Sequence, residues 1–145
     1  MSNEKGITLV EILTAMGILT VILSLGYFVG FDFYKNYALH SEKDVLISVL
    51  RKARSQALNN VGATAHGVYI GDSSYTIFYG NSFVSRDSQY DENIKRAPGI
   101  SLSGLNEAVF QPLTATSTAS STIALSNNQK TFFIDLNYEG RINWR

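Results

Sequence analysis

The sequence predicts an α+β protein, with one long N-terminal helix followed by a small antiparallel β-sheet domain. Residues 7–33 are almost all apolar, and no proline occurs before Pro98, so nothing breaks a helix in the first part of the chain. Beyond residue 62 the pattern changes to short β-rich runs separated by turn residues, as in antiparallel strands. A chain of 145 residues suffices for one membrane helix and one small domain.

The first part of the predicted helix is long and apolar enough to cross a membrane. Between Ile7 and Phe31 the only charged residue is Glu11. A helix over this run would be roughly 37 Å long at about 1.5 Å per residue, which exceeds a hydrocarbon core of about 30 Å. Lys5 precedes the run, and basic residues favour the cytoplasmic side, so we expect a single-pass protein whose C-terminal part lies outside the cytoplasm.

Past the membrane run the helix is predicted to become amphipathic and to pack on a sheet. Charged residues such as Glu42 and Lys43 are predicted to lie mostly off the apolar face. Asn59 and Asn60 are typical C-cap residues, so the helix is predicted over about residues 7–59. The apolar face consists of Leu39, Val45, Leu46, Val49, Leu50, Ala53 and Ala57.

The second half is predicted to form several short antiparallel strands. Residues 65–70 and 75–79 flank Gly71-Asp72-Ser73-Ser74, which predicts a hairpin. Residues 85–99 read as a loop. Further strands are predicted at 100–102, 108–110, 122–125, 131–136 and 141–144, the last three as an antiparallel meander.

The order of residues at the start of the chain is more specific than its hydropathy. A short polar leader ends in Lys5-Gly6, the apolar Ile7 follows at once, and the lone carboxylate of Glu11 stands four places later. This order resembles the class III signal of type IV pilins and type II secretion pseudopilins. The resemblance implies a prepilin peptidase that cuts between Gly6 and Ile7, N-methylation of Ile7, and a role for Glu11 in filament assembly and register.

The same resemblance implies a pilin fold, a location and a set of partners. The protein would reside in the inner membrane and then enter a periplasmic or extracellular filament with other pilins or pseudopilins. An assembly platform protein and, indirectly, its ATPase would act on it, and no cofactor is implied. The expected organisation is a leader, a transmembrane helix, an amphipathic continuation of that helix and a β domain, over residues 1–6, 7–33, 34–61 and 62–145.

A physical argument supports the assigned role of Glu11. A carboxylate at the membrane centre costs about 2.5 to 3.5 kcal/mol on insertion scales and tends to mark function, although near a helix end it can reach the interface. Cleavage after Gly6 would expose an ammonium on Ile7 at the same depth. In a filament, Glu11 of one subunit could neutralise that amine on another, and such a desolvated pair favours register more than stability.

Two other interpretations explain the N-terminal run less completely. An ordinary secretory signal would be cut near Ala15-Met16-Gly17 or Ser24-Leu25-Gly26, but the apolar run continues past Gly26 and Glu11 does not suit the apolar region of such a signal. A plain signal anchor leaves Glu11 unexplained. Neither accounts for glycine, apolar residue and glutamate at this spacing.

The rest of the chain resembles one branch of the same superfamily, the H-type pseudopilins and related minor pilins. The matching segments are Ala53-Arg54-Ser55-Gln56-Ala57, the hairpin that follows, Val109-Phe110, Thr122-Ile123-Ala124-Leu125 and Gly140-Arg141-Ile142.

Composition and motifs argue against an enzyme. Twelve basic and twelve acidic residues give no net charge, and cysteine is absent. No nucleophile elbow or phosphate-binding glycine loop occurs, and His40 and His66 have no second ligand at metal-binding spacing. The acidic loop over 86–93 could hold a hard cation such as calcium, but a solvated loop is preferred. The Ser/Thr-rich run over 114–122 fits a flexible loop.

The C-terminal residues Arg141, Trp144 and Arg145 suggest a second function. Two guanidiniums and an indole can contact phosphates and stack on a base. The segment resembles the arginine-bearing tails of minor pilins that bind DNA during natural transformation, although Asn143 replaces a second arginine of that pattern. The preferred interpretation is an edge strand with solvated arginines and with Ile142 and Trp144 facing the core. A membrane-anchored sensor or enzyme domain is the remaining alternative.

Overall fold

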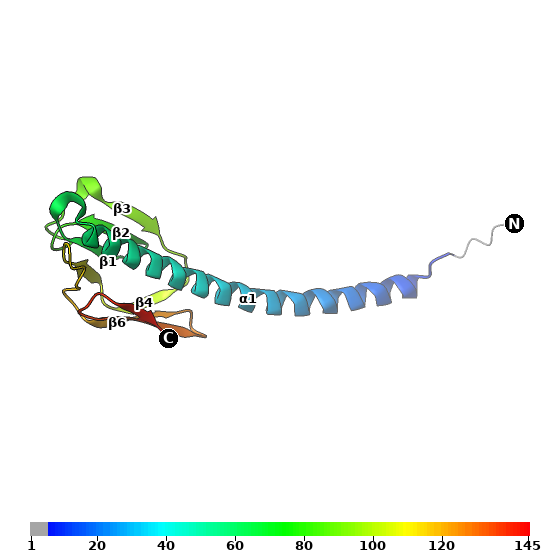
Figure 1. The fold of residues 1–145 in the computed structure, drawn as a ribbon. Coiled ribbons are helices and arrows are strands. Elements are labelled where there is room, and N and C mark those ends of the chain that lie inside the picture. Colours follow the sequence, from blue (N-terminus) through cyan, green and yellow to red (C-terminus); the bar gives the residue numbers. More distant parts are fainter. Residues whose placement is uncertain (1–5) are drawn as a thin grey trace. The chain divides into compact units, whose positions relative to one another are not determined.

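The computed structural model describes residues 6–145, with the side chains of residues 27–32 left out of the description. Helix α1 (Leu9–Leu58) is one continuous run of 50 residues (Figure 1). The chain divides within this helix into two compact units, Met1–Lys35 and Asn36–Arg145. The first described unit is the apolar part of α1, and the second contains the remainder of α1 with all of the strands.

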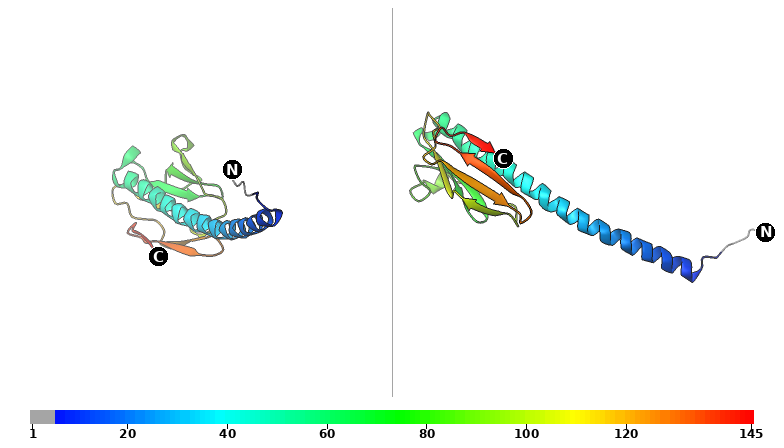
Figure 2. Two further views of the ribbon diagram at one scale, coloured as in Figure 1. Left: turned by 90° about the vertical axis from the view of Figure 1, so that its right-hand side faces the viewer. Right: turned by 90° about the horizontal axis from the view of Figure 1, so that it is seen from below.

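In the C-terminal unit, α1 packs on two antiparallel sheets of four strands each, which confirms the predicted α+β class (Figure 2). The first sheet has the order β3-β2-β1-β5 and the second β4-β6-β7-β8. Short 3-10 helices lie at η1 (Val61–Ala63) and η2 (Ser88–Tyr90). The strands are β1 (His66–Ile70), β2 (Ser74–Tyr79), β3 (Glu92–Lys95), β4 (Ser101–Gly104), β5 (Glu107–Phe110), β6 (Ser121–Ser126), β7 (Thr131–Leu136) and β8 (Ile142–Trp144).

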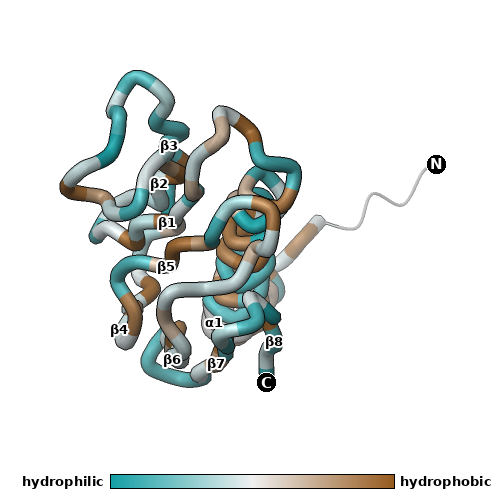
Figure 3. Tube along the Cα trace, turned by 60° about the vertical axis from the view of Figure 1, so that its left-hand side comes forward, coloured by the Kyte–Doolittle hydropathy of each residue, from teal (hydrophilic) through white to brown (hydrophobic). Residues whose placement is uncertain are grey.

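The core of this unit lies between α1 and both sheets. The helix contributes side chains three or four residues apart, so that they share one face. Figure 3 shows that α1 and the strands carry both hydrophobic and hydrophilic residues. The largest fully buried apolar members of this cluster are Leu39, Leu46, Leu50, Tyr75, Ile77, Phe110, Ile123, Leu125, Ile134 and Leu136.

The predicted hairpin and C-terminal meander are both confirmed. β1 and β2 pair antiparallel with Ile70 opposite Tyr75, and β6, β7 and β8 follow one another in the second sheet. The sequence did not indicate that the strands divide into two sheets. β5 pairs with β1 in the first sheet, whereas β4 pairs with β6 in the second.

The prediction of a loop over residues 85–99 was wrong for Glu92–Lys95, which form β3 at the edge of the first sheet. This strand has a single apolar residue, Ile94, so its sequence carries no alternating hydrophobic signal. Pairing with β2 supplies its hydrogen bonds, with Ser74 opposite Lys95. Glu92 also receives hydrogen bonds from the Lys52 ammonium on α1 at 2.6 Å.

The prediction that Glu42 and Lys43 lie mostly off the apolar face of α1 was wrong for both residues. Their side chains are buried, with 3% and 5% of each residue exposed. The Tyr75 hydroxyl donates to Glu42 Oε1 at 2.6 Å, and the backbone N–H of Ala97 donates to Oε2 at 2.9 Å. A buried carboxylate is tolerated when its oxygens are satisfied in this way.

Arg96 completes the surroundings of Glu42. Its Nε lies 3.8 Å from Glu42 Oε1, and its terminal nitrogens donate to the carbonyls of Gly71, Asp72 and Ile100 at 2.6 to 2.9 Å. This guanidinium therefore joins α1, the turn after β1 and the start of β4.

Burial raises the pKa of the Tyr75 hydroxyl above its ordinary value, and the hydrogen bond to Glu42 raises it further. The phenol therefore stays protonated and acts as the donor in this contact. Glu42 is held by two segments that are distant from it in the sequence, β2 with Tyr75 and the segment of Arg96 and Ala97.

We expect Tyr75→Phe to lower the free energy of unfolding by about 1–3 kcal/mol, because it removes a donor from a buried carboxylate oxygen. Denaturant unfolding of the full chain in detergent, followed by fluorescence of the single tryptophan, Trp144, measures the change. Tyr138→Phe is the matched control, because Tyr138 is 66% exposed and its variant should stay within about 0.5 kcal/mol of the parent. Equal unfolding midpoints for the two variants would contradict the expectation.

Candidate functional site

The first turn of α1 is closed by a reciprocal pair of hydrogen bonds between Thr8 and Glu11. The backbone N–H of Glu11 donates to Thr8 Oγ1 at 3.3 Å, and the backbone N–H of Thr8 donates to Glu11 Oε2 at 3.5 Å. This is a capping box, in which two amide groups at the helix start are satisfied by side chains. A carboxylate in the first turn also interacts favourably with the helix dipole.

Thr8 is the site residue that the sequence interpretation missed. Its signal was present, since a threonine followed three residues later by a glutamate before an apolar run is the pattern of a capping box. The structure brings Thr8 and Glu11 together at the first turn and places Ile7 immediately before them.

The bond between Gly6 and Ile7 lies in a segment without regular structure before α1. Both residues are exposed, and Ile7 is 75% exposed. A Cβ atom added to Gly6 would meet no described atom within 4 Å. The peptide bond between Gly6 and Ile7 is therefore not covered by any residue that the structure describes.

The apolar segment Leu9–Gly26 is long and hydrophobic enough to cross a membrane, with a mean hydropathy of 2.1 over 18 residues. None of these residues is buried within the described chain. Their polar hydroxyls bond back to the helix itself: Thr14 to the carbonyls of Val10 and Glu11, Thr20 to that of Met16 and Ser24 to that of Val21. Glu11 is thus the one charged side chain on an otherwise apolar, uncovered helix surface.

The contacts of Glu11 leave its carboxylate available to another cation. Among the described residues, its carboxylate accepts one hydrogen bond, from the Thr8 amide, and that bond is long at 3.5 Å. Glu42, on the same helix, instead receives short bonds from Tyr75 and Ala97. A cation brought to the first turn of α1 would therefore displace little in order to reach Glu11.

The C-terminal candidates Arg141, Trp144 and Arg145 have separate partners within the chain. Arg141 Nε lies 3.4 Å from Glu139, and Arg145 Nε lies 3.5 Å from Asp135, and both arginine side chains are more than 70% exposed. The structure therefore does not bring the three side chains together in one binding site.

Trp144 contacts α1 through the side chain of Lys43. The Lys43 ammonium lies 3.7 Å from the centre of the indole ring, a cation–π contact, while the tryptophan remains 53% exposed. β8 is an edge strand, and its Ile142 packs against the core cluster. The indole therefore covers Lys43 rather than entering the core.

The two histidines and the acidic loop do not form a metal centre among the described residues. His66 is buried with Nε2 2.8 Å from the carbonyl oxygen of Val61, and His40 is exposed with its ring against Phe132. In the loop, Asp91 binds Arg86 at 2.8 Å and Asp87 caps η2. These carboxylates already have partners in the chain.

Residues 1–27 match the family model of the prokaryotic N-terminal methylation motif. No curated protein and no solved structure matches the chain significantly. The matched residues contain Gly6, Ile7, Thr8 and Glu11, and they end just after the apolar segment Leu9–Gly26.

We expect Thr8→Ala to open the first turn of α1, because the Glu11 amide loses its side-chain acceptor. Loss of an N-cap costs about 0.5–2 kcal/mol, so hydrogen exchange of that amide should become roughly 2- to 30-fold faster. Exchange measured on the full chain in detergent tests this, with Thr20→Ala as control because its hydroxyl bonds only to the Met16 carbonyl. An unchanged exchange rate at Glu11 in Thr8→Ala would exclude the capping role.

Proposed function

Because its methylation motif and apolar helix support a type IV pilin or pseudopilin anchored once in the inner membrane, we propose that this protein is a minor, H-type subunit of such a filament. It has no catalytic activity of its own in this proposal. The observation that carries the proposal is the apolar surface of Leu9–Gly26, which no described residue covers and which has a single carboxylate at its start.

An uncovered surface of this kind requires an apolar environment. Most large apolar side chains in this segment are at least half exposed, and water is a poor solvent for so continuous a surface. Lipid can cover it, and so can the apolar helices of neighbouring subunits. We propose that lipid covers the segment before assembly, and that the apolar helices of neighbouring subunits cover it in the filament.

The proposed maturation acts at the accessible bond before α1. A prepilin peptidase cuts between Gly6 and Ile7, and the new amine of Ile7 is N-methylated. Thr8 and Glu11 both remain in the shortened chain, so the capping box can form after cleavage. The long bond from the Thr8 amide then competes with the terminal ammonium of a neighbouring subunit for Glu11, and the charge pair sets the register.

The C-terminal unit supplies the surface of the subunit in this proposal. Within this unit Glu42 is bound by Tyr75, and Asp91 is bound by Arg86. We infer that the energy for assembly comes from the ATPase of the assembly machinery, through the platform protein. The C-terminal unit lies outside the cytoplasm and then on a periplasmic or extracellular filament.

We expect Glu11→Ala to be cleaved and methylated normally but to enter filaments at least tenfold less efficiently, because the buried terminal amine loses its counterion. Mass spectrometry of the membrane form should show a chain that begins at methylated Ile7. Immunoblotting of sheared filaments then measures incorporation.

Two further variants separate charge from shape in this experiment. Glu11→Gln keeps the length of the side chain but should fail like Glu11→Ala. Glu139→Gln changes an exposed glutamate on the turn before β8 and should assemble normally. Normal incorporation of Glu11→Ala would refute the register role, and a mature chain that still begins at Met1 would refute the proposed function.

DNA binding is the second candidate function, favoured by the exposure of Arg141 and Arg145. Because each guanidinium has an acidic partner and the Trp144 indole covers Lys43, we expect no retention of single- or double-stranded DNA at physiological salt. Mobility shift of labelled oligonucleotides with the full chain in detergent tests this. Salt-dependent binding that disappears in Arg141→Ala with Arg145→Ala would establish this function instead.

A further inference from the structure

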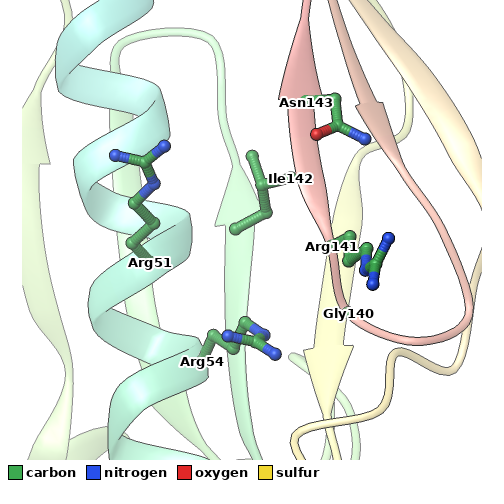
Figure 4. A pocket seen from close by; sticks show the side chains of 6 residues that line it. All are labelled: Arg51, Arg54, Gly140, Arg141, Ile142 and Asn143. Carbon is green, nitrogen blue, oxygen red and sulfur yellow. The ribbon is translucent and has the colours of Figure 1, made fainter.

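A small cavity lies between the last turns of α1 and the segment that enters β8 (Figure 4). Its volume is about 220 Å³. Arg51 and Arg54 line it from the helix, and Arg141 lines it from the opposite side. The remaining lining residues are Gly140, Ile142 and Asn143.

The two helix arginines have no counterion among the described residues. Neither Arg51 nor Arg54 forms an ion pair or a hydrogen bond with a side chain or carbonyl of residues 6–145, whereas Arg141 is paired with Glu139. Arg54 Nε is also buried, and it lacks an acceptor. A buried donor left unsatisfied costs about 1–3 kcal/mol, so this nitrogen favours an acceptor that enters from outside the chain.

Gly140 keeps the wall beside Arg54 open. Its backbone has a φ of +74°, and a Cβ atom there would lie 2.1 Å from the carbonyl oxygen of Ala115 and 3.1 Å from Arg54 Nε. Only glycine fits this position without a shift of the backbone. The segment that holds Ala115 is itself attached to the end of α1, because the Leu113 N–H donates to the Ala57 carbonyl at 2.9 Å.

We propose that this cavity binds a phosphate dianion, either free or as a small phosphate monoester. Two guanidiniums without counterions match a charge of minus two, and planar guanidiniums bind phosphate oxygens in pairs. The Arg54 Nε–H supplies a donor that is already desolvated. The inference is independent of the filament role, because it uses only residues of the C-terminal unit.

The charge of the cavity separates this ligand from a DNA strand. The cavity volume of about 220 Å³ can hold one phosphate group. Each phosphodiester of DNA carries a single negative charge. Arg145, which belongs to the DNA hypothesis, does not line the cavity.

Isothermal titration of the full chain in detergent tests the proposal, with sodium chloride added so that ionic strength stays constant. Inorganic phosphate and phenyl phosphate represent the free ion and the monoester, and dimethyl phosphate and acetate represent singly charged anions. We expect saturable binding of one or both dianions, at least tenfold tighter than that of either monoanion. Whichever of the two dianions binds more tightly identifies the source.

Three variants locate the binding site. Arg54→Gln and Arg51→Gln should each weaken the binding of the dianion at least tenfold, and Arg51 is exposed, so its variant should fold even if Arg54→Gln does not. Arg145→Gln is the matched control and should bind like the parent. The proposal is overturned if neither dianion binds at constant ionic strength, if the monoanions bind equally well, or if Arg51→Gln binds like the parent.

Discussion

Helix α1 has to bury its apolar side chains in two different surroundings, and the rest of the structure follows from that constraint. From residue 36 onward, side chains of the helix are covered by two sheets of the same chain. Over Leu9–Gly26 nothing in the described chain covers them. A backbone whose hydrogen bonds are satisfied within the helix suits both surroundings, because neither lipid nor a protein core supplies water to unpaired amides.

The two glutamates of α1 illustrate how surroundings decide the role of a charge. Glu42 is enclosed and receives short hydrogen bonds from Tyr75 and Ala97, with Arg96 nearby, so its charge stabilises the packing of the C-terminal unit. Within residues 6–145, Glu11 accepts only the long bond of the capping box. A satisfied carboxylate serves the fold of its own chain, whereas an incompletely satisfied one on an apolar surface is available to a partner.

The arginines differ in the same way. Arg96 and Arg86 bind carbonyls or carboxylates within the chain and belong to the fold. Arg51 and Arg54 face a cavity whose opposite wall is formed by residues almost ninety positions later, around Gly140. The cavity therefore contains two arginines without a counterion in the part of the chain that the structure describes. Its shape is maintained by the close approach of Gly140 to Ala115.

The amino-acid sequence alone was sufficient to predict the long helix, its apolar half, the hairpin of β1 and β2, the final meander and the N-terminal motif. Each of these depends on residues close together in the chain, whose periodicity or spacing can be read directly. The order of Gly6, Ile7 and Glu11 is of this kind. So is the capping pattern of Thr8 and Glu11, which could have been recognised from the sequence.

Tertiary packing was needed to establish the burial of Glu42 and Lys43, the strand at Glu92–Lys95, the division into two sheets and the arginine cavity. Each depends on partners far apart in sequence: Ala97 is 55 residues from Glu42, and Glu92 is 40 residues from Lys52. A local pattern assigns a charged residue to the solvent, because burial of a charge is costly without a partner. Folding supplies that partner, and its position is set by the packing of the whole C-terminal unit.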